Sequence, residues 1–195
     1  MIGYELPVSV NVGGKEYSIT NRGDFRMILD CFSALNDKEV PKSLRVADSL
    51  IIFYEDINSD EDIQRVFGDH AEEAVKQMFS FFNCYQLEGG TKVNHKLIDW
   101  EQDAQLVCAA VNTVAQTEIR SEPYLHWFTF LGYYMSVGDS VLATVVALRD
   151  KRARGKKLEK HEREFINDHP EYFFTTEEIE EQQEIDEILQ ELLDK

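Results

Sequence analysis

The first 20 residues alternate apolar and polar positions in the way that is typical of β-strands. Residues 7–12, PVSVNV, alternate, and residues 15–20, KEYSIT, alternate again. Gly13 and Gly14 join the two runs, and a Gly-Gly pair between alternating segments favours a tight hairpin turn. We therefore expect a β-hairpin over about residues 7–20. Because an isolated hairpin is only marginally stable, it is expected to pack on helices or against the edge of another subunit.

From about residue 24 onward, apolar positions recur every three to four residues, which is the spacing of one helix face. Helices are expected to begin near residues 24, 41, 60, 71, 99, 124 and 141, with a break near Gly68 and a polar loop over residues 88–95. The predicted apolar stripes include Leu44 in the second helix and Val141 in the last. Residues 136–139 divide the apolar stretch 125–148 into two short helices, so no membrane span of about 20 residues is expected there.

These patterns predict a mainly α protein: a multi-helix globular domain with a small N-terminal β-hairpin. We expect one mostly helical domain over residues 1–170, followed by an acidic helix or tail over residues 171–195. A chain of this length can bury a hydrophobic core without disulfides or metals.

Composition and charge narrow the classes of partner. The net charge of −17 disfavours binding to nucleic acid and to anionic membranes, and is compatible with basic or aggregation-prone protein partners. One basic block, residues 149–157, precedes an acidic run over residues 171–194. These two runs are expected either to contact one another or to be solvated faces. The block lacks interleaved aromatic residues for base stacking, so nucleic-acid binding is not expected.

The three cysteines, Cys31, Cys84 and Cys108, are widely spaced and lie in apolar stretches, so we expect buried, reduced thiols. This indicates a reducing compartment, and the N-terminus lacks the basic and apolar regions of a signal peptide. Local signatures of phosphate-binding loops, dinucleotide sites and nucleophile elbows are missing. We therefore expect no enzyme activity, no cofactor and no metal site.

Three acidic or histidine-containing stretches need a separate explanation. Residues 56–62 resemble the opening of a calcium loop, but Glu61 occupies the glycine position, so a loop with a helix cap is expected. Asp99, Glu101 and Asp103 are expected to stabilise a helix N-terminus, since residues two apart on a helix diverge and hold a metal poorly. His126, beside Trp127, is expected to be a buried structural histidine.

Three segments carry a family resemblance. They are PVSVNVGGKEYSI (residues 7–19) followed by Asp24-Phe25-Arg26, then DWEQDAQLVCAA (residues 99–110), then LHWFTFL (residues 125–131) continuing to LRDKRARGKKLEK (residues 148–160). Together they span most of residues 1–170. In these segments the chain resembles a bacteriophage family encoded near the tape measure gene in siphophage tail clusters. The Leu-His-Trp-aromatic element is the most specific of the shared features.

The resemblance implies a tail assembly chaperone-like protein of the host bacterial cytoplasm. Its partner would be the tape measure protein or another tail protein, with a homo-oligomer also possible. The alternative is a virion structural protein of the tail or connector. Apolar side chains are the candidates for partner binding, although those of the aromatic helix can equally be core. They are Tyr124, Trp127, Phe128, Phe130, Leu131 and Tyr134 in the aromatic helix, and Ile185, Ile188, Leu189 and Leu192 near the C-terminus.

Overall fold

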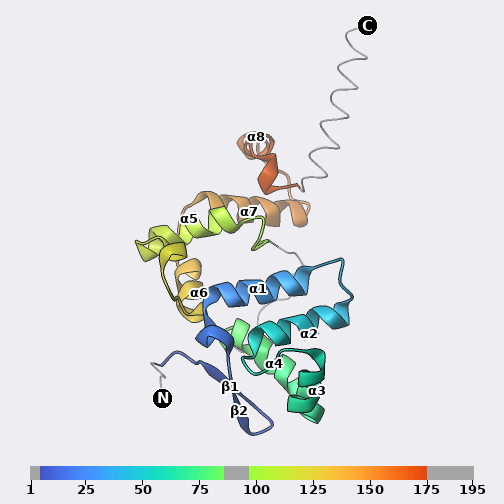
Figure 1. The fold of residues 1–195 in the computed structure, drawn as a ribbon. Coiled ribbons are helices and arrows are strands. Elements are labelled where there is room, and N and C mark those ends of the chain that lie inside the picture. The colour runs from blue at the N-terminus through green and yellow to red at the C-terminus, as the bar shows by residue number, and fades with distance from the viewer. Residues whose placement is uncertain (1–4, 86–96, 175–195) are drawn as a thin grey trace. The chain divides into compact units, whose positions relative to one another are not determined.

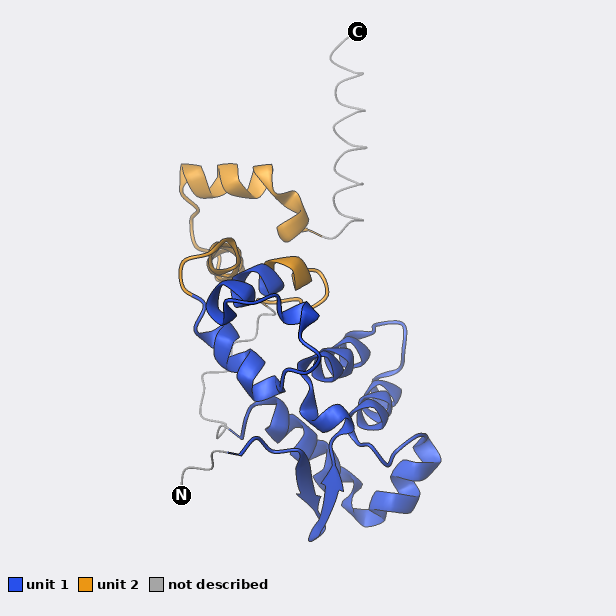
Figure 2. Cartoon of the chain, turned by 60° about the vertical axis from the view of Figure 1, so that its left-hand side comes forward, with its two compact units in different colours: residues 1–92, 107–137 blue, residues 93–106, 138–195 orange. Residues whose placement is uncertain are grey.

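The computed structural model describes residues 5–85 and 97–174 (Figure 1). The chain divides into two compact units, which are described separately (Figure 2). Unit 1 comprises residues 1–92 and 107–137, and unit 2 comprises residues 93–106 and 138–195. The C-terminal candidates Ile185, Ile188, Leu189 and Leu192, and the loop expected over residues 88–95, lie outside the described residues.

The predicted hairpin is present at the start of unit 1. Strand β1 (Ser9–Val12) pairs antiparallel with strand β2 (Lys15–Ser18), with Val12 opposite Lys15. Gly13 and Gly14 have φ values of +59° and +80°, a conformation that glycine adopts without steric cost. Val10, Val12 and Tyr17 turn one face of the hairpin into the core of the unit, as the alternating pattern predicts.

The described residues of unit 1 also form six helices: α1 (Phe25–Asn36), α2 (Lys42–Phe53), α3 (Asp60–Phe67), α4 (Ala71–Phe82), α5 (Ala104–Ala115) and α6 (Trp127–Met135). The first three residues of α5 belong to unit 2. Short 3₁₀ helices link them: η1 (Thr20–Gly23), η2 (Gly68–His70) and η3 (Ile119–Ser121). Helices α1 and α2 run antiparallel, side by side (Figure 1). Ser59 caps α3 through the N–H of Asp62, and Gly68 ends it at φ +50°, where the break was predicted.

An aromatic core holds unit 1 together. The Phe25 ring of α1 stacks on the Phe130 ring of α6, with centroids 4.6 Å apart. Phe53, at the end of α2, meets the Phe81 ring of α4 edge-on. Each such aromatic pair adds about 0.5–1.5 kcal/mol beyond the burial of apolar area. The core therefore joins α1, α2, α4 and α6 directly.

Unit 2 contains α7 (Val141–Ala153), α8 (Lys160–Asp168) and the 3₁₀ helix η4 (Pro170–Tyr172). A capping box starts α8: the carboxylates of Glu159 and Glu162 each accept a backbone N–H of the first turn. Leu142, Val145 and Leu148 form the buried stripe of α7. Ser140 caps α7 after the predicted interruption at residues 136–139.

The prediction of a mainly α fold with an N-terminal hairpin is confirmed. Three local predictions are wrong. Leu44 and Val141 remain 44% and 49% exposed because each lies in the first turn of its helix, off the buried stripe. The helix expected from Asp99 begins at Ala104, since residues 100–103 form turns. Among the described residues, no helix has the length and apolarity that crossing a bilayer requires. The single domain over residues 1–170 stays a prediction.

Candidate functional site

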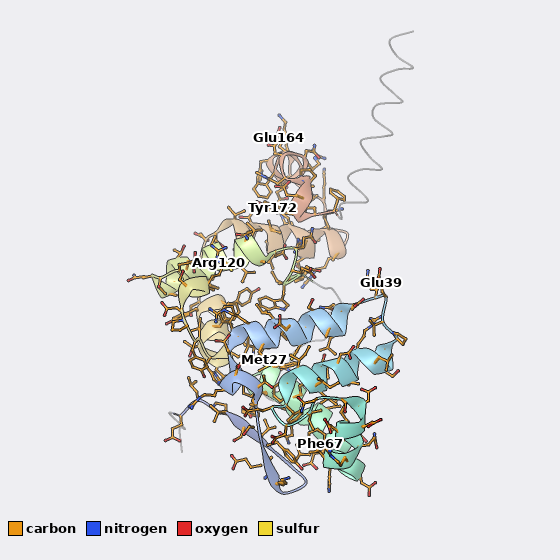
Figure 3. The ribbon with its side chains drawn as sticks, in the orientation of Figure 1. Met27, Glu39, Phe67, Arg120, Glu164 and Tyr172 are labelled. Carbon is orange, nitrogen blue, oxygen red and sulfur yellow. The ribbon has the colours of Figure 1, made fainter. Side chains whose placement is uncertain are left out.

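An open groove of about 880 Å³ lies on unit 1, between α1, the end of α2 and two connecting segments. Its lining includes Met27 and Asp30 from α1, Ile51 and Ile52 from α2, Glu55 just after α2, and Tyr124. Met27 is labelled in Figure 3. The groove thus combines residues from three separate parts of the chain. No pattern within one of those parts indicates it.

The segment η1 borders the groove in an unusual backbone conformation. Asn21, Arg22 and Gly23 follow one another with φ values of +48°, +55° and +75°. A Cβ atom on Gly23 would lie 2.9 Å from Phe81 Cζ and 3.2 Å from His126 Nε2, so only glycine fits this close approach. Two non-glycine residues in the left-handed region carry a conformational cost, which the surrounding contacts must offset.

A buried carboxylate anchors the segment before α6 to the start of α1. The Asp24 side chain accepts the N–H groups of Arg26 and Leu125, at 3.0 and 2.9 Å. The Arg26 guanidinium pairs with the same carboxylate at 3.0 Å and also donates to the carbonyl oxygens of Ile119 and Glu122. Charge-assisted bonds of this kind are stronger than neutral ones. The Asp24-Phe25-Arg26 motif of the sequence is therefore the centre that positions residues 119–125.

Tyr124 lines the groove and is 41% exposed. Its hydroxyl donates to the carbonyl oxygen of Arg22 at 3.0 Å, and partial burial raises the pKa of this hydroxyl. The hydrogen bond fixes the ring without covering it. An exposed, immobilised aromatic ring loses little conformational entropy on binding, which suits contact with another protein.

His126 is buried and hydrogen-bonded, as predicted. Its Nδ1 accepts the N–H of Phe128, capping α6, and its Nε2–H donates to the carbonyl oxygen of Pro7 at 2.8 Å. These two bonds define the neutral Nε2–H tautomer. Burial lowers the pKa of His126. The ring connects the N-terminal segment to α6 and is not free to act on a ligand.

The structure separates the predicted aromatic binding residues into two groups. Trp127 and Phe130 are each 1% exposed and belong to the core, and Trp127 Nε1–H donates to the carbonyl oxygen of Phe82 at 2.9 Å. Phe128, Leu131 and Tyr134 are half-buried, and Tyr124 is exposed. Of the predicted residues in the described chain, Tyr124 alone lines the groove.

The groove carries carboxylates that sequence reasoning missed. In the described part of the chain, neither Asp30 nor Glu55 has an ion pair, and partial burial raises the pKa of Asp30. Asp30 lies on α1 and Glu55 just after α2, and the sequence does not distinguish them from other solvated charges. Only their shared position in the lining of the groove indicates that Asp30 and Glu55 are candidate binding residues.

Unit 2 has a buried polar centre at Asp103. Its side chain is fully buried and pairs with Arg149, whose NH2 lies 2.8 Å from Asp103 Oδ1. Asp103 directly precedes α5, and its carboxylate also accepts the N–H of Asp99 at 2.9 Å, while Asp99 accepts the N–H groups of Glu101 and Gln102. The sequence predicts carboxylates at this helix start but not the buried ion pair with Arg149. Arg149 also donates to the carbonyl oxygens of Leu97 and Tyr172.

The basic block that follows is largely paired within unit 2. Lys151 binds Glu162, Arg154 binds Asp150 at 2.8 Å, and Arg152 lies 4.7 Å from the centre of the Phe174 ring. The acidic run after residue 174 lies outside the described residues, so its contact with the block stays a prediction. Lys151, Arg152 and Arg154 therefore each have a contact within unit 2.

The described residues contain no group of three or more His, Cys, Asp or Glu side chains suited to holding a metal ion. In the stretch that resembles a calcium loop, Asp62 accepts the N–H of Asn58 and donates its own N–H to Ser59. These bonds form the loop and helix cap that were expected there. The groove on unit 1 has mixed apolar and acidic walls.

The family model described as Bacteriophage Gp15 protein matches residues 3–173. No curated protein and no solved structure matches the chain.

Proposed function

Since this chain belongs to the Bacteriophage Gp15 protein family, we propose that it is a tail assembly chaperone-like protein. It binds the tape measure protein or another tail protein in the host bacterial cytoplasm during siphophage tail morphogenesis, and it is not an enzyme. The family match supports a phage protein, and the resemblance to proteins encoded near the tape measure gene supports the role in the tail. The groove on unit 1 is the observation that carries the binding role.

A tape measure protein is long and helical, with apolar stretches that must not aggregate before tail subunits polymerise around it. A chaperone for such a protein needs an apolar surface to bind those stretches and charge to keep the complex in solution. The groove supplies Ile51, Ile52 and the exposed ring of Tyr124. The net charge of −17 supplies the repulsion between complexes.

Co-expression with the tape measure protein encoded nearby tests this proposal, with a pull-down and light scattering as readouts. We expect a stoichiometric complex that stays in solution where the tape measure protein alone precipitates. Tyr124→Ala should weaken the complex, whereas Met135→Ala is the control, since Met135 is 66% exposed on the same unit and does not line the groove. If both variants form the same amount of complex, Tyr124 is not part of the binding surface.

Mass spectrometry of purified particles separates the two candidate roles. A chaperone leaves before the tail is complete, so the protein should be absent from particles or far below one copy per tail subunit. A stoichiometric amount in particles, together with no association with the tape measure protein, would replace the proposal with a structural role in the tail or connector.

A further inference from the structure

The acidic side chains of the groove have a regular relation to its apolar residues. On α1, Asp30 follows Met27 by three residues, so the two share one helix face. Glu55 lies just beyond the end of α2 and lines the groove together with Ile51 and Ile52. Each of the two walls therefore combines an apolar side chain with a carboxylate.

The positive charges at the groove do not neutralise these carboxylates. Arg26 is already bound to Asp24 and to the carbonyl oxygens of Ile119 and Glu122. Arg22 lines the groove on the η1 side, next to Tyr124. Asp30 and Glu55 are exposed and have no ion pair in the described part of the chain, so their negative charge is available to a cation that binds beside the apolar residues of the groove.

We infer that the groove binds a basic amphipathic helix of a partner protein, which rests on the proposed function and specifies the segment recognised. The apolar face of that helix would lie on Ile51 and Ile52, as a third helix beside the antiparallel pair α1 and α2. Its lysine or arginine side chains would reach Asp30 and Glu55. Tyr124 would contact the aliphatic stem of a cation or accept it over its ring.

Charge complementarity selects this occupant over the alternatives. An acidic helix, a phosphate group or a nucleic acid would meet two unpaired carboxylates and a chain of net charge −17. A second copy of this chain would bring the same negative charge. A basic segment gains both from the local carboxylates and from the long-range field, which raises its association rate.

Fluorescence anisotropy with the full chain and two synthetic helices provides the test. The first peptide, of about 18 residues, has a leucine face flanked by lysines, and the second replaces each lysine by glutamate. The variant Asp30→Asn/Glu55→Gln removes the two groove charges. The control Asp48→Asn/Glu61→Gln removes two exposed charges outside the groove. Both variants gain the same net charge, so non-specific attraction changes equally.

We expect the basic peptide to bind and the acidic peptide not to bind. The affinity of the basic peptide for the groove variant should be about tenfold lower than for wild type, and its affinity for the control variant should lie within about twofold of wild type. An unchanged unfolding midpoint would show that the groove variant is folded. Equal affinity of the two variants, or equal affinity of the two peptides, would overturn the inference. A complex with the tape measure protein that persists in the groove variant would overturn it as well, while leaving the proposed function in place. Peptide discrimination without any tape measure complex would support the inference and refute the proposed partner.

Discussion

Replacing Arg149 by Leu removes the cation at the buried polar centre of unit 2. Arg149 lies 2.8 Å from Asp103 Oδ1 and donates to Leu97 O at 3.0 Å and Tyr172 O at 2.9 Å. The side chains of Asp103 and Arg149 are 0% and 15% exposed, so water cannot replace the lost donors. Breaking a buried pair in this way costs about 3–5 kcal/mol. That is a large part of the roughly 5–15 kcal/mol that holds a domain folded.

The two tryptophans show in which unit the stability is lost. Trp100 lies in unit 2 and Trp127 in unit 1, so ¹⁹F NMR of 5-fluorotryptophan-labelled protein follows each unit separately. In Arg149→Leu, the Trp100 signal should reach its unfolded position at a urea concentration lower by about 1–3 M. Arg154→Leu is the control, because Arg154 is 52% exposed in its pair with Asp150. Loss of such an exposed pair costs about 0.3–0.5 kcal/mol.

A second variant tests the reasoning about the uncompensated charge. Replacing Asp103 and Arg149 together by Leu removes both charges, and should restore part of the stability that Arg149→Leu loses. If Arg149→Leu shifts the Trp100 midpoint no more than Arg154→Leu does, the buried pair does not hold unit 2 together. If the double variant is less stable than Arg149→Leu, the cost does not come from a buried, unpaired carboxylate.

Three further predictions concern unit 1. Gly23→Ala should lower the unfolding free energy by about 1–3 kcal/mol, because the new Cβ would lie 2.9 Å from Phe81 Cζ at φ +75°. Gly132→Ala in α6, where nothing lies within 4 Å of a new Cβ, should raise the unfolding free energy by about 0.5–1 kcal/mol. Thermal unfolding measures both variants, and a change of the same sign in the two would refute the steric argument. Burial lowers the pKa of His126 below its ordinary 6.5, so the unfolded chain takes up its proton first. Stability should therefore be full above pH 6.5 and fall as the pH is lowered toward the folded-state pKa, with a smaller slope in His126→Asn; an equal slope would exclude His126 as the cause. Cys31 is buried, whereas Cys84 and Cys108 are only partly buried. Alkylation followed by mass spectrometry should therefore modify Cys84 and Cys108 in the folded protein and Cys31 only after unfolding.

Local patterns were sufficient for much of the fold. The alternation around Gly13 and Gly14 predicts the hairpin, and the residues after Asp24, Ser59 and Ser140 begin helices at those caps. These predictions succeed because turn chemistry and helix capping act within a few residues of the chain. The start of α5 was misplaced because Asp99 caps a turn whose pattern is shared with a helix start.

The candidate site depended on tertiary structure. The aromatic run from Tyr124 to Tyr134 predicts a helix but not which of its residues face the core, and the helix begins only at Trp127, which leaves Tyr124 in the preceding segment. Trp127 and Phe130 became core residues because α1 and α4 cover them, whereas Tyr124 stayed exposed and lines the groove. Asp103 and Arg149 likewise gained their role only when the fold brought them together across 46 positions of sequence.

What local sequence predicts and what only tertiary structure decides differ for one physical reason. Hydrogen bonds of turns, caps and helices join neighbours in the chain, so the types of neighbouring residues determine them. Burial, ion pairing and the shape of a groove depend on segments that meet after folding, such as α1, the end of α2 and Tyr124 here. The sequence by itself therefore determined the elements and the charge of this phage protein, and the packing of those elements decided which side chains are available to a partner.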